Sequence, residues 1–123
     1  MITCIVVDDS RGIVEGFSDI LCLLGLEVVG KGYDGMNAVN LYKEHRPNII
    51  FCDVNMPRYD GFYAVEKIKD FDPDAKIVIV TADFTLETQQ RMKDICVTAM
   101  IYKPFDQSEI RRVLLEEYQI KTQ

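Results

Sequence analysis

The sequence contains no long hydrophobic run and no excess of basic residues, and each absence excludes a class of protein. No stretch approaches the roughly 18 apolar residues that a membrane-spanning helix needs, so membrane insertion is not expected. The chain carries 14 basic and 20 acidic residues, for a net charge of −6. Because acidic surfaces repel phosphate backbones, nucleic acid is not expected as a direct partner. Met1 leads into an apolar run without a basic segment or cleavage site, which predicts no export signal and a cytoplasmic location.

Motifs for a zinc site or a disulfide framework are also missing. The four cysteines form no CxxC pair, and the single histidine, His45, has no cysteine near it at ligand spacing. Cys4 and Cys52 lie inside apolar runs. We therefore expect all four cysteines, including Cys22 and Cys96, to be reduced and buried as small hydrophobic side chains.

The residues that are present predict a single α/β domain over residues 1–123. The chain is 48% hydrophobic, which is enough for one core at this length. Short apolar, mostly β-branched runs alternate with amphipathic stretches that have helical spacing. Strands are predicted over 4–7, 27–30, 48–52, 77–80 and 100–102. Helices are predicted over 13–24, 38–42, 62–68, 86–95 and 106–114, the last with Asp106 and Glu109 in capping-box spacing.

Five strand–helix units in this order predict a parallel sheet with five flanking helices on its two faces. The length suits the flavodoxin-like strand order 2-1-3-4-5, in which ligands bind beyond the carboxyl ends of the strands. The sequence ends about one helix after the fifth strand, so no attached output domain is expected.

Polar residues follow four of the predicted strands. Asp8 and Asp9 follow the first, Asp53 the third, Thr81 the fourth and Lys103 the fifth. At about 5 Å and an effective dielectric of about 20, each pair of carboxylates repels by about 3 kcal/mol. A cation relieves that cost, and an all-oxygen ligand set selects Mg²⁺ or Mn²⁺. Taken singly, each residue is as well explained by helix capping or a salt bridge, but their joint placement favours one site.

The same residues carry a family resemblance. Asp8-Asp9, the segment DVNMPRYDG at 53–61, Thr81-Ala82 and the triplet KPF at 103–105 are similar to the motifs of receiver domains in two-component response regulators. The resemblance covers residues 2 to about 119. It implies a phosphoacceptor switch that signals by changing its affinity for a downstream protein, rather than an enzyme.

The resemblance also implies residue roles. Asp53 accepts a phosphoryl group from a phosphohistidine on a histidine kinase or phosphotransfer protein. Asp9 binds Mg²⁺ directly, Asp8 binds it directly or through water, and the backbone carbonyl of Asn55 supplies another oxygen. Asp53 itself completes the metal ligands.

The remaining implied roles belong to residues around the acceptor. Lys103 pairs with Asp53 at rest and with the phosphoryl group afterwards, Thr81 donates its hydroxyl to that group, and Pro104 follows a cis peptide bond. Asn55 and Asp83 border the path of the hydrolytic water. Met56-Pro57 and Asp60-Gly61 supply a bend and a tight turn before the third helix.

One position departs from the family pattern. Members often carry Tyr or Phe three residues before the lysine, and this chain has Met100 there. Tyr102, at alternating strand spacing, is expected to share the face of Met100 and to cover the output surface, formed by the fourth helix, fifth strand and fifth helix.

Other functions remain as alternatives. A chemotaxis-type regulator and a phosphorelay intermediate share this chemistry, and the sequence does not separate them. A metal-dependent phosphohydrolase with an aspartyl nucleophile needs a second acid two residues past the nucleophile, where this chain has Asn55. A flavin-binding module needs a phosphate loop after the first strand, where Asp8 and Asp9 repel phosphate.

Overall fold

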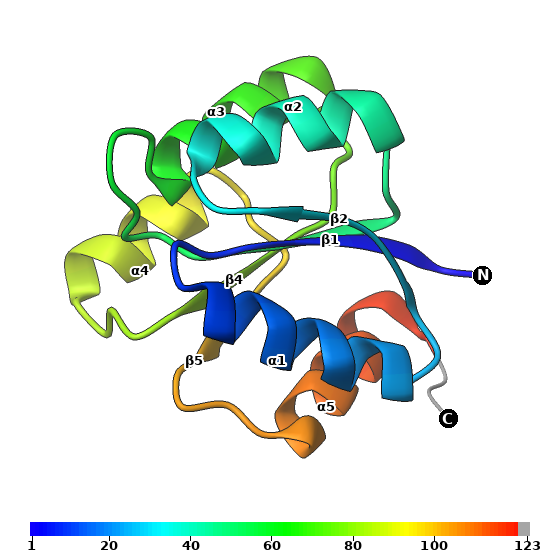
Figure 1. Cartoon of the computed structure of the whole chain (residues 1–123). Coiled ribbons are helices and arrows are strands. Elements are labelled where there is room, and N and C mark those ends of the chain that lie inside the picture. Colours follow the sequence, from blue (N-terminus) through cyan, green and yellow to red (C-terminus); the bar gives the residue numbers. More distant parts are fainter. Residues whose placement is uncertain (121–123) are drawn as a thin grey trace.

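The computed structural model describes residues 1–120, and ten elements alternate along them as predicted (Figure 1). Residues 121–123 of the predicted domain lie outside the described part. The strands are β1 (Thr3–Val7), β2 (Glu27–Gly32), β3 (Ile49–Cys52), β4 (Ile77–Thr81) and β5 (Ala99–Tyr102). The helices are α1 (Arg11–Leu23), α2 (Gly35–His45), α3 (Gly61–Phe71), α4 (Leu86–Asp94) and α5 (Gln107–Tyr118).

The five strands form one parallel sheet in the order β2-β1-β3-β4-β5, which confirms the predicted topology. Val7 and Cys52 are register partners at the ends of β1 and β3. Thr81 and Tyr102 are partners at the ends of β4 and β5. The loops that follow these strand ends therefore lie at one edge of the sheet, on the left of Figure 1.

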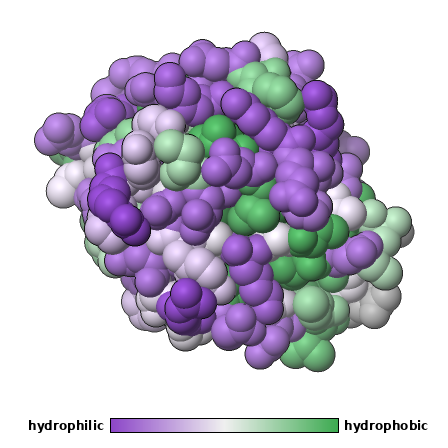
Figure 2. Space-filling view, turned by 45° about the horizontal axis from the view of Figure 1, so that its top comes forward, coloured by the Kyte–Doolittle hydropathy of each residue, from purple (hydrophilic) through white to green (hydrophobic). Residues whose placement is uncertain are grey.

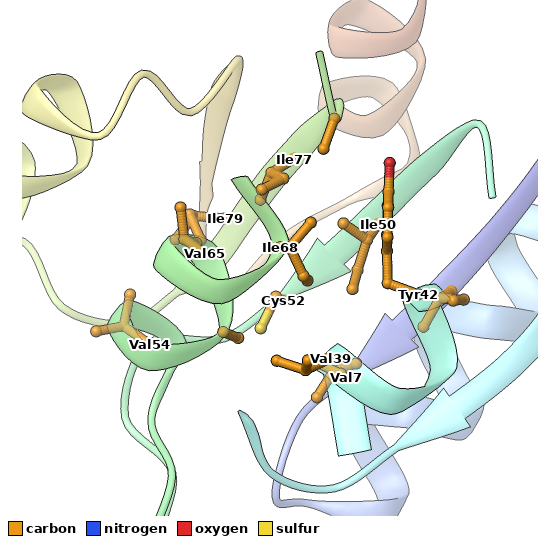
Figure 3. Packing of buried hydrophobic residues seen from close by; sticks show 14 of the residues in the cluster. Val7, Val39, Tyr42, Ile50, Cys52, Val54, Val65, Ile68, Ile77 and Ile79 are labelled. Atoms are coloured by element: carbon orange, nitrogen blue, oxygen red, sulfur yellow. The ribbon is translucent and has the colours of Figure 1, made fainter. Parts of the chain in front are cut away.

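Hydrophobic side chains cover both faces of the sheet. On one face, side chains of β1, β3 and β4 such as Ile50 and Ile79 pack against α2 and α3 (Figure 3). Met92, the buried methionine of α4, belongs to the same core. On the other face, Phe17 of α1 packs on Phe51 of β3, with α5 alongside. Burial on both faces explains why these strands are continuously apolar in the sequence.

Each helix begins next to a side chain that caps it. The caps accept the backbone N–H of the residue three positions later and are Ser10, Asp34, Asp60, Thr85 and Asp106. Helices α2 and α3 begin earlier than their apolar pattern predicts, at Gly35 and Gly61. The pattern misses these first residues because glycine has no side chain that contributes to it. Gly25 ends α1 with φ 95°, in the left-handed region that the predicted stop requires.

The cysteine prediction is correct for two residues and wrong for two. Cys4 and Cys52 are buried, and burial raises the pKa of Cys4 to about 12. Cys22 and Cys96 are exposed, Cys22 on α1 and Cys96 after the end of α4. All four are free thiols. Among residues 1–120, no helix is long and apolar enough to cross a membrane.

Candidate phosphoacceptor and metal site

Three carboxylates meet at the carboxyl edge of the sheet, as the strand order predicts. Asp8 and Asp53 continue β1 and β3, and the Asp53 N–H still donates to the Val7 carbonyl oxygen at 3.0 Å. Their exposed fractions are only 3% and 5%, whereas Asp9 is exposed. One carboxylate oxygen from each of the three lies within 4.8 Å of the others. The parallel register thus brings residues 45 positions apart in the sequence into one acidic cluster.

Lys103 bridges the two buried carboxylates. Its Nζ donates to Asp8 Oδ2 at 2.5 Å and to Asp53 Oδ2 at 3.1 Å. Burial by itself lowers the pKa of Lys103, but the hydrogen bond to Asp8 and the charges of Asp53 and Asp8 outweigh it and raise the pKa above its ordinary value. The resemblance implied only the contact with Asp53. The contact with Asp8 was missed because sequence spacing does not tell which carboxylate a long side chain reaches.

The donor set of this cluster fits Mg²⁺. Three carboxylates against one ammonium leave a local charge of −2, which a divalent cation balances. Asp53 Oδ1 accepts the Val54 N–H at 2.7 Å, and each carboxylate oxygen has a further lone pair for a metal ion. Only oxygen donors are present, as Mg²⁺ prefers. Asn55 lies two residues past Asp53 on the exposed part of the same loop.

Helix capping does not explain Asp8 and Asp9. The cap of α1 is Ser10, whose Oγ accepts the Ile13 N–H at 3.3 Å. Asp8 Oδ1 instead accepts the Ser10 N–H at 2.9 Å, which holds the start of the loop against the site. Neither acid is therefore the cap of α1, and both belong to the carboxylate cluster.

Thr81 is connected to the start of α4 through Asp83. Thr81 is fully buried, and its Oγ1 accepts the Asp83 N–H at 3.1 Å. The Asp83 carboxylate accepts bonds from the Thr88 hydroxyl at 2.7 Å and from the N–H and hydroxyl of Thr85 at 2.9 and 2.7 Å. These bonds, with one from the Asn55 side chain, lower the pKa of Asp83. No pattern in the sequence indicated this network.

The segment 53–61 is shaped by close backbone contact as well as by its turn. Asp60 caps α3 by accepting the Tyr63 N–H at 2.9 Å. The left-handed residue of the loop is Arg58, with φ 66°. Gly61 has another role: a Cβ atom there would lie 2.7 Å from Val54 Cα and would overlap the Asp53 carbonyl oxygen. The glycine is needed so that α3 can start directly against the backbone of Asp53 and Val54.

The face of β5 beside α4 carries the residues expected there. Tyr102 OH donates to Met100 Sδ at 3.9 Å, so both side chains share a face as predicted. The Phe84 ring, 60% exposed, stacks on Tyr102 with centroids 4.6 Å apart. A groove of about 660 Å³ runs between α4 and β5, lined by Met100, Tyr102 and polar α4 residues such as Lys93. The Lys103–Pro104 peptide bond is cis, as the resemblance implies.

Comparisons with known proteins agree on one family. The model of the response regulator receiver domain matches residues 4–115. The chemotaxis protein CheY of Thermotoga maritima is 34% identical over 114 residues, covering 89% of this chain and 92% of the relative. The sporulation initiation phosphotransferase F of Bacillus subtilis is 25% identical, covering 96% of this chain and 94% of the relative.

Solved structures show the same fold. The chemotaxis protein CheY4 of Vibrio cholerae has a TM-score of 0.88 at 28% identity, covering 95% of this chain and 98% of that one. A chain from the CheX-CheY-BeF3-Mg+2 complex of Borrelia burgdorferi has a TM-score of 0.91 at 24% identity, covering 98% and 90%.

The chain belongs to the receiver domain family of response regulators. Receiver domains are the phosphoacceptor switches of two-component systems, and this chain is one of them. The phosphohydrolase and flavin-binding alternatives are not favoured.

Proposed function

We propose that Asp53 is the phosphoacceptor, with Mg²⁺ held by Asp8, Asp9, Asp53 and the Asn55 backbone carbonyl. The observation that carries this proposal is the cluster itself, in which Lys103 bonds two buried carboxylates and the third lies within 4.8 Å. Mg²⁺ supplies charge neutralisation for the incoming phosphoryl oxygens. Mn²⁺ shares the preference for oxygen ligands and is the competing ion.

The chemistry asked of Asp53 is a simple displacement. An Asp53 carboxylate oxygen attacks phosphorus and the P–N bond of the donor phosphohistidine breaks. The electron pair of that bond leaves with the imidazole nitrogen, which takes up a proton from solvent. Positioning and charge stabilisation do most of the work in phosphoryl transfer. Lys103 is already within hydrogen-bond distance of the attacking carboxylate, and the buried Thr81 hydroxyl is the donor proposed for the phosphoryl group.

The output surface of this proposal is formed by α4, β5 and α5. The groove beside Met100 and Tyr102 lies on it, and the Thr81–Asp83 contact joins the site to the start of α4. Proposed partners are a histidine kinase or phosphotransfer protein as donor and a downstream protein as target. Relatives that act in chemotaxis and in sporulation both match the chain, so a chemotaxis-type regulator is proposed with a phosphorelay intermediate as the alternative.

Two further assignments belong to the same proposal. Residues 1–123 form one receiver domain, supported by the single sheet and the family match over 4–115. The protein works in the cytoplasm, supported by four free cysteines, which are typical of a reducing compartment.

The proposal is tested by phosphorylation with a small acyl phosphate and Mg²⁺, followed by mass mapping. We expect one phosphoryl group on Asp53, lost on treatment with hydroxylamine and absent in excess chelator. Asp53→Asn is expected to abolish the label, and Asp70→Asn, an acid on α3, is the matched control that keeps it. Label that persists in Asp53→Asn contradicts the proposal. Replacing Mg²⁺ with Mn²⁺ in the same assay measures which ion the site prefers.

A further inference from the structure

The first residue of α2, Gly35, packs against the loop that carries Asp53, although none of the site side chains described above comes from α2. The Gly35 N–H donates to the Tyr59 carbonyl oxygen at 2.6 Å. A Cβ atom at Gly35 would lie 2.8 Å from that oxygen and would overlap the Asp60 carbonyl oxygen. The backbone of α2 is therefore in direct contact with the loop backbone at residues 59 and 60. Both segments lie on the left of Figure 1, where α2 and α3 begin.

A second contact of the same kind follows immediately in the chain. Gly61 comes directly after Asp60, and its N–H donates to the Val54 carbonyl oxygen at 2.8 Å. As described above, a Cβ atom at Gly61 would overlap the Asp53 carbonyl oxygen. Residues 60 and 61 are thus held between the start of α2 and the backbone of the acceptor. Two consecutive backbone contacts therefore connect Gly35 to Asp53.

Gly35 is not required for its own backbone conformation. Among the glycines of residues 1–120, only Gly25 has a positive φ. The backbone conformation at position 35 is therefore one that alanine also adopts, and alanine has the higher helix propensity. What alanine adds is one methyl group, at the point where two carbonyl oxygens of the loop approach. The close approach is the feature that needs glycine.

We propose that Gly35 is a positioning residue for the phosphoacceptor site. By letting α2 close on residues 59 and 60, it sets the place of the loop that bears Asp53 and Asn55. The inference rests on the proposed function of Asp53. A shift of about 1 Å at a reacting group is enough to cost about a hundredfold in rate. Loss of a group that orients metal ligands typically weakens metal binding by about 10- to 100-fold.

The test compares Gly35→Ala with Gly16→Ala. Gly16 also lies in a helix, α1, but a Cβ atom there has no neighbour within 4 Å. We expect Gly35→Ala to weaken Mg²⁺ binding at least about tenfold, measured without phosphoryl donor from the shift of urea unfolding midpoints with Mg²⁺ concentration. The rate of phosphoryl uptake from an acyl phosphate should fall at least as much. Gly16→Ala should match wild type in both measurements.

The outcomes separate positioning from packing. A Gly35→Ala protein that is less stable in EDTA but binds Mg²⁺ and takes up phosphate like wild type has lost packing only, and the inference is then wrong. A variant that is as stable as wild type with unchanged Mg²⁺ binding overturns it too. Failure of the wild-type protein to become labelled counts against the proposed function instead, while the Mg²⁺ measurement still decides the role of Gly35.

A milder pair of variants decides the case if Gly35→Ala does not fold. Asp34→Ala removes the cap of α2, in which Oδ1 accepts the Asn37 N–H at 2.8 Å. It also removes the 3.9 Å ion pair of Asp34 with Arg58 of the loop, and it adds no atom to the loop contact. Asp106→Ala removes the equivalent cap of α5, where Oδ1 accepts the Glu109 N–H at 3.0 Å. The inference requires weaker Mg²⁺ binding in Asp34→Ala than in Asp106→Ala. Equal binding in the two variants overturns it.

Discussion

At the scale of single residues, Lys103 decides whether the two buried carboxylates are tolerated. The side chains of Asp8 and Asp53 are 4% and 7% exposed, and that of Lys103 is 18% exposed. Water therefore screens these charges little. Removing one partner of a buried ionic network leaves the other charges uncompensated, which costs far more than a surface pair contributes.

Replacing Lys103 with methionine is therefore expected to lower the free energy of unfolding by about 3 kcal/mol at neutral pH without metal. Urea denaturation in EDTA measures it, and Mg²⁺ should recover part of the loss by neutralising the same carboxylates. The control is Lys31→Met, which breaks the exposed pair of Lys31 with Glu15 at 3.0 Å and should cost less than about 1 kcal/mol. Equal losses in the two variants would mean that Lys103 does not compensate the buried acids.

The site could be predicted from the sequence to the extent that parallel strands fix it. Asp8, Asp53 and Lys103 each follow a short apolar run, and parallel strands end at one edge, so their meeting was predictable. The distances between these side chains were not predictable from the sequence. The Lys103–Asp8 hydrogen bond is therefore seen only in the structure. Gly61 looked like a turn residue but serves close packing, because a turn signal says nothing of what approaches it.

At the scale of elements, α4 has the fewest buried residues and depends on its first turn. Only Thr88 and Met92 of this helix are buried. The sequence predicted a helix at this position, but it did not indicate which contacts hold the start of the helix in place. The Asp83 carboxylate does so by accepting the Thr85 and Thr88 hydroxyls. Because the Asp83 N–H donates to Thr81 Oγ1, one hydrogen bond connects Thr81, the proposed donor to the phosphoryl group, with this turn.

Acid should loosen the start of α4. The hydrogen bonds from Thr88 and Thr85 lower the pKa of Asp83 in the folded protein. The stabilisation is therefore present above the unfolded-state pKa and is lost as pH falls through the lower folded-state value. Protection of the Thr88 amide, taken as its exchange rate relative to the intrinsic rate at the same pH, should fall over that range. In Asp83→Asn this acid-induced loss of protection at the start of α4 should vanish. The start of α5, whose cap Asp106 also has a lowered pKa, should still lose protection in acid. An unchanged acid-induced loss of Thr88 protection in Asp83→Asn contradicts the role given to Asp83.

Phosphorylation should change the exchange of α4 amides through Thr81. We expect a roughly 5- to 150-fold change in wild type, the range of typical coupling between two sites. Thr81→Ala removes the acceptor of the Asp83 N–H and should abolish this change. Met100→Tyr should alter its size, because the larger ring enters the groove between α4 and β5, while phosphoryl uptake stays intact. An unaltered response in Thr81→Ala would show that the signal takes another route.

At the scale of the whole molecule, the fold was the most predictable feature. Five apolar runs and the connection rules of parallel sheets give the order of the strands. The least predictable was the surface. The face in Figure 2, with α2 and α3 turned toward the viewer, is mostly hydrophilic with smaller apolar patches. Sequence patterning did not place the exposed Phe84, Leu86 and Leu115, because exposure of a single apolar residue in a helix or loop has no periodic signal.

The acidic cluster also affects the stability of the entire domain. Lys103 bonds Asp8 and Asp53, which leaves Asp9 as the one carboxylate of the cluster that this lysine does not contact within the described residues 1–120. At 4.8 Å and an effective dielectric of about 20, each pair of charges repels by about 3.5 kcal/mol before screening. Exposure of Asp9 to solvent reduces this to about 1 kcal/mol. The extended unfolded chain lacks most of the repulsion.

Asp9→Asn is therefore expected to stabilise the metal-free protein by about 1 kcal/mol. The substitution removes a proposed Mg²⁺ ligand, so the stabilisation gained from metal, RT ln(1 + [Mg²⁺]/Kd), should be smaller in the variant. Curves of unfolding free energy against Mg²⁺ should then converge or cross. Urea denaturation at several Mg²⁺ concentrations, with EDTA as the zero point, measures both effects. Asp19→Asn, at an exposed position of α1, is the charge-matched control that should leave the Mg²⁺ response unchanged. A variant less stable than wild type in EDTA, yet equally responsive to Mg²⁺, would place the metal away from Asp9.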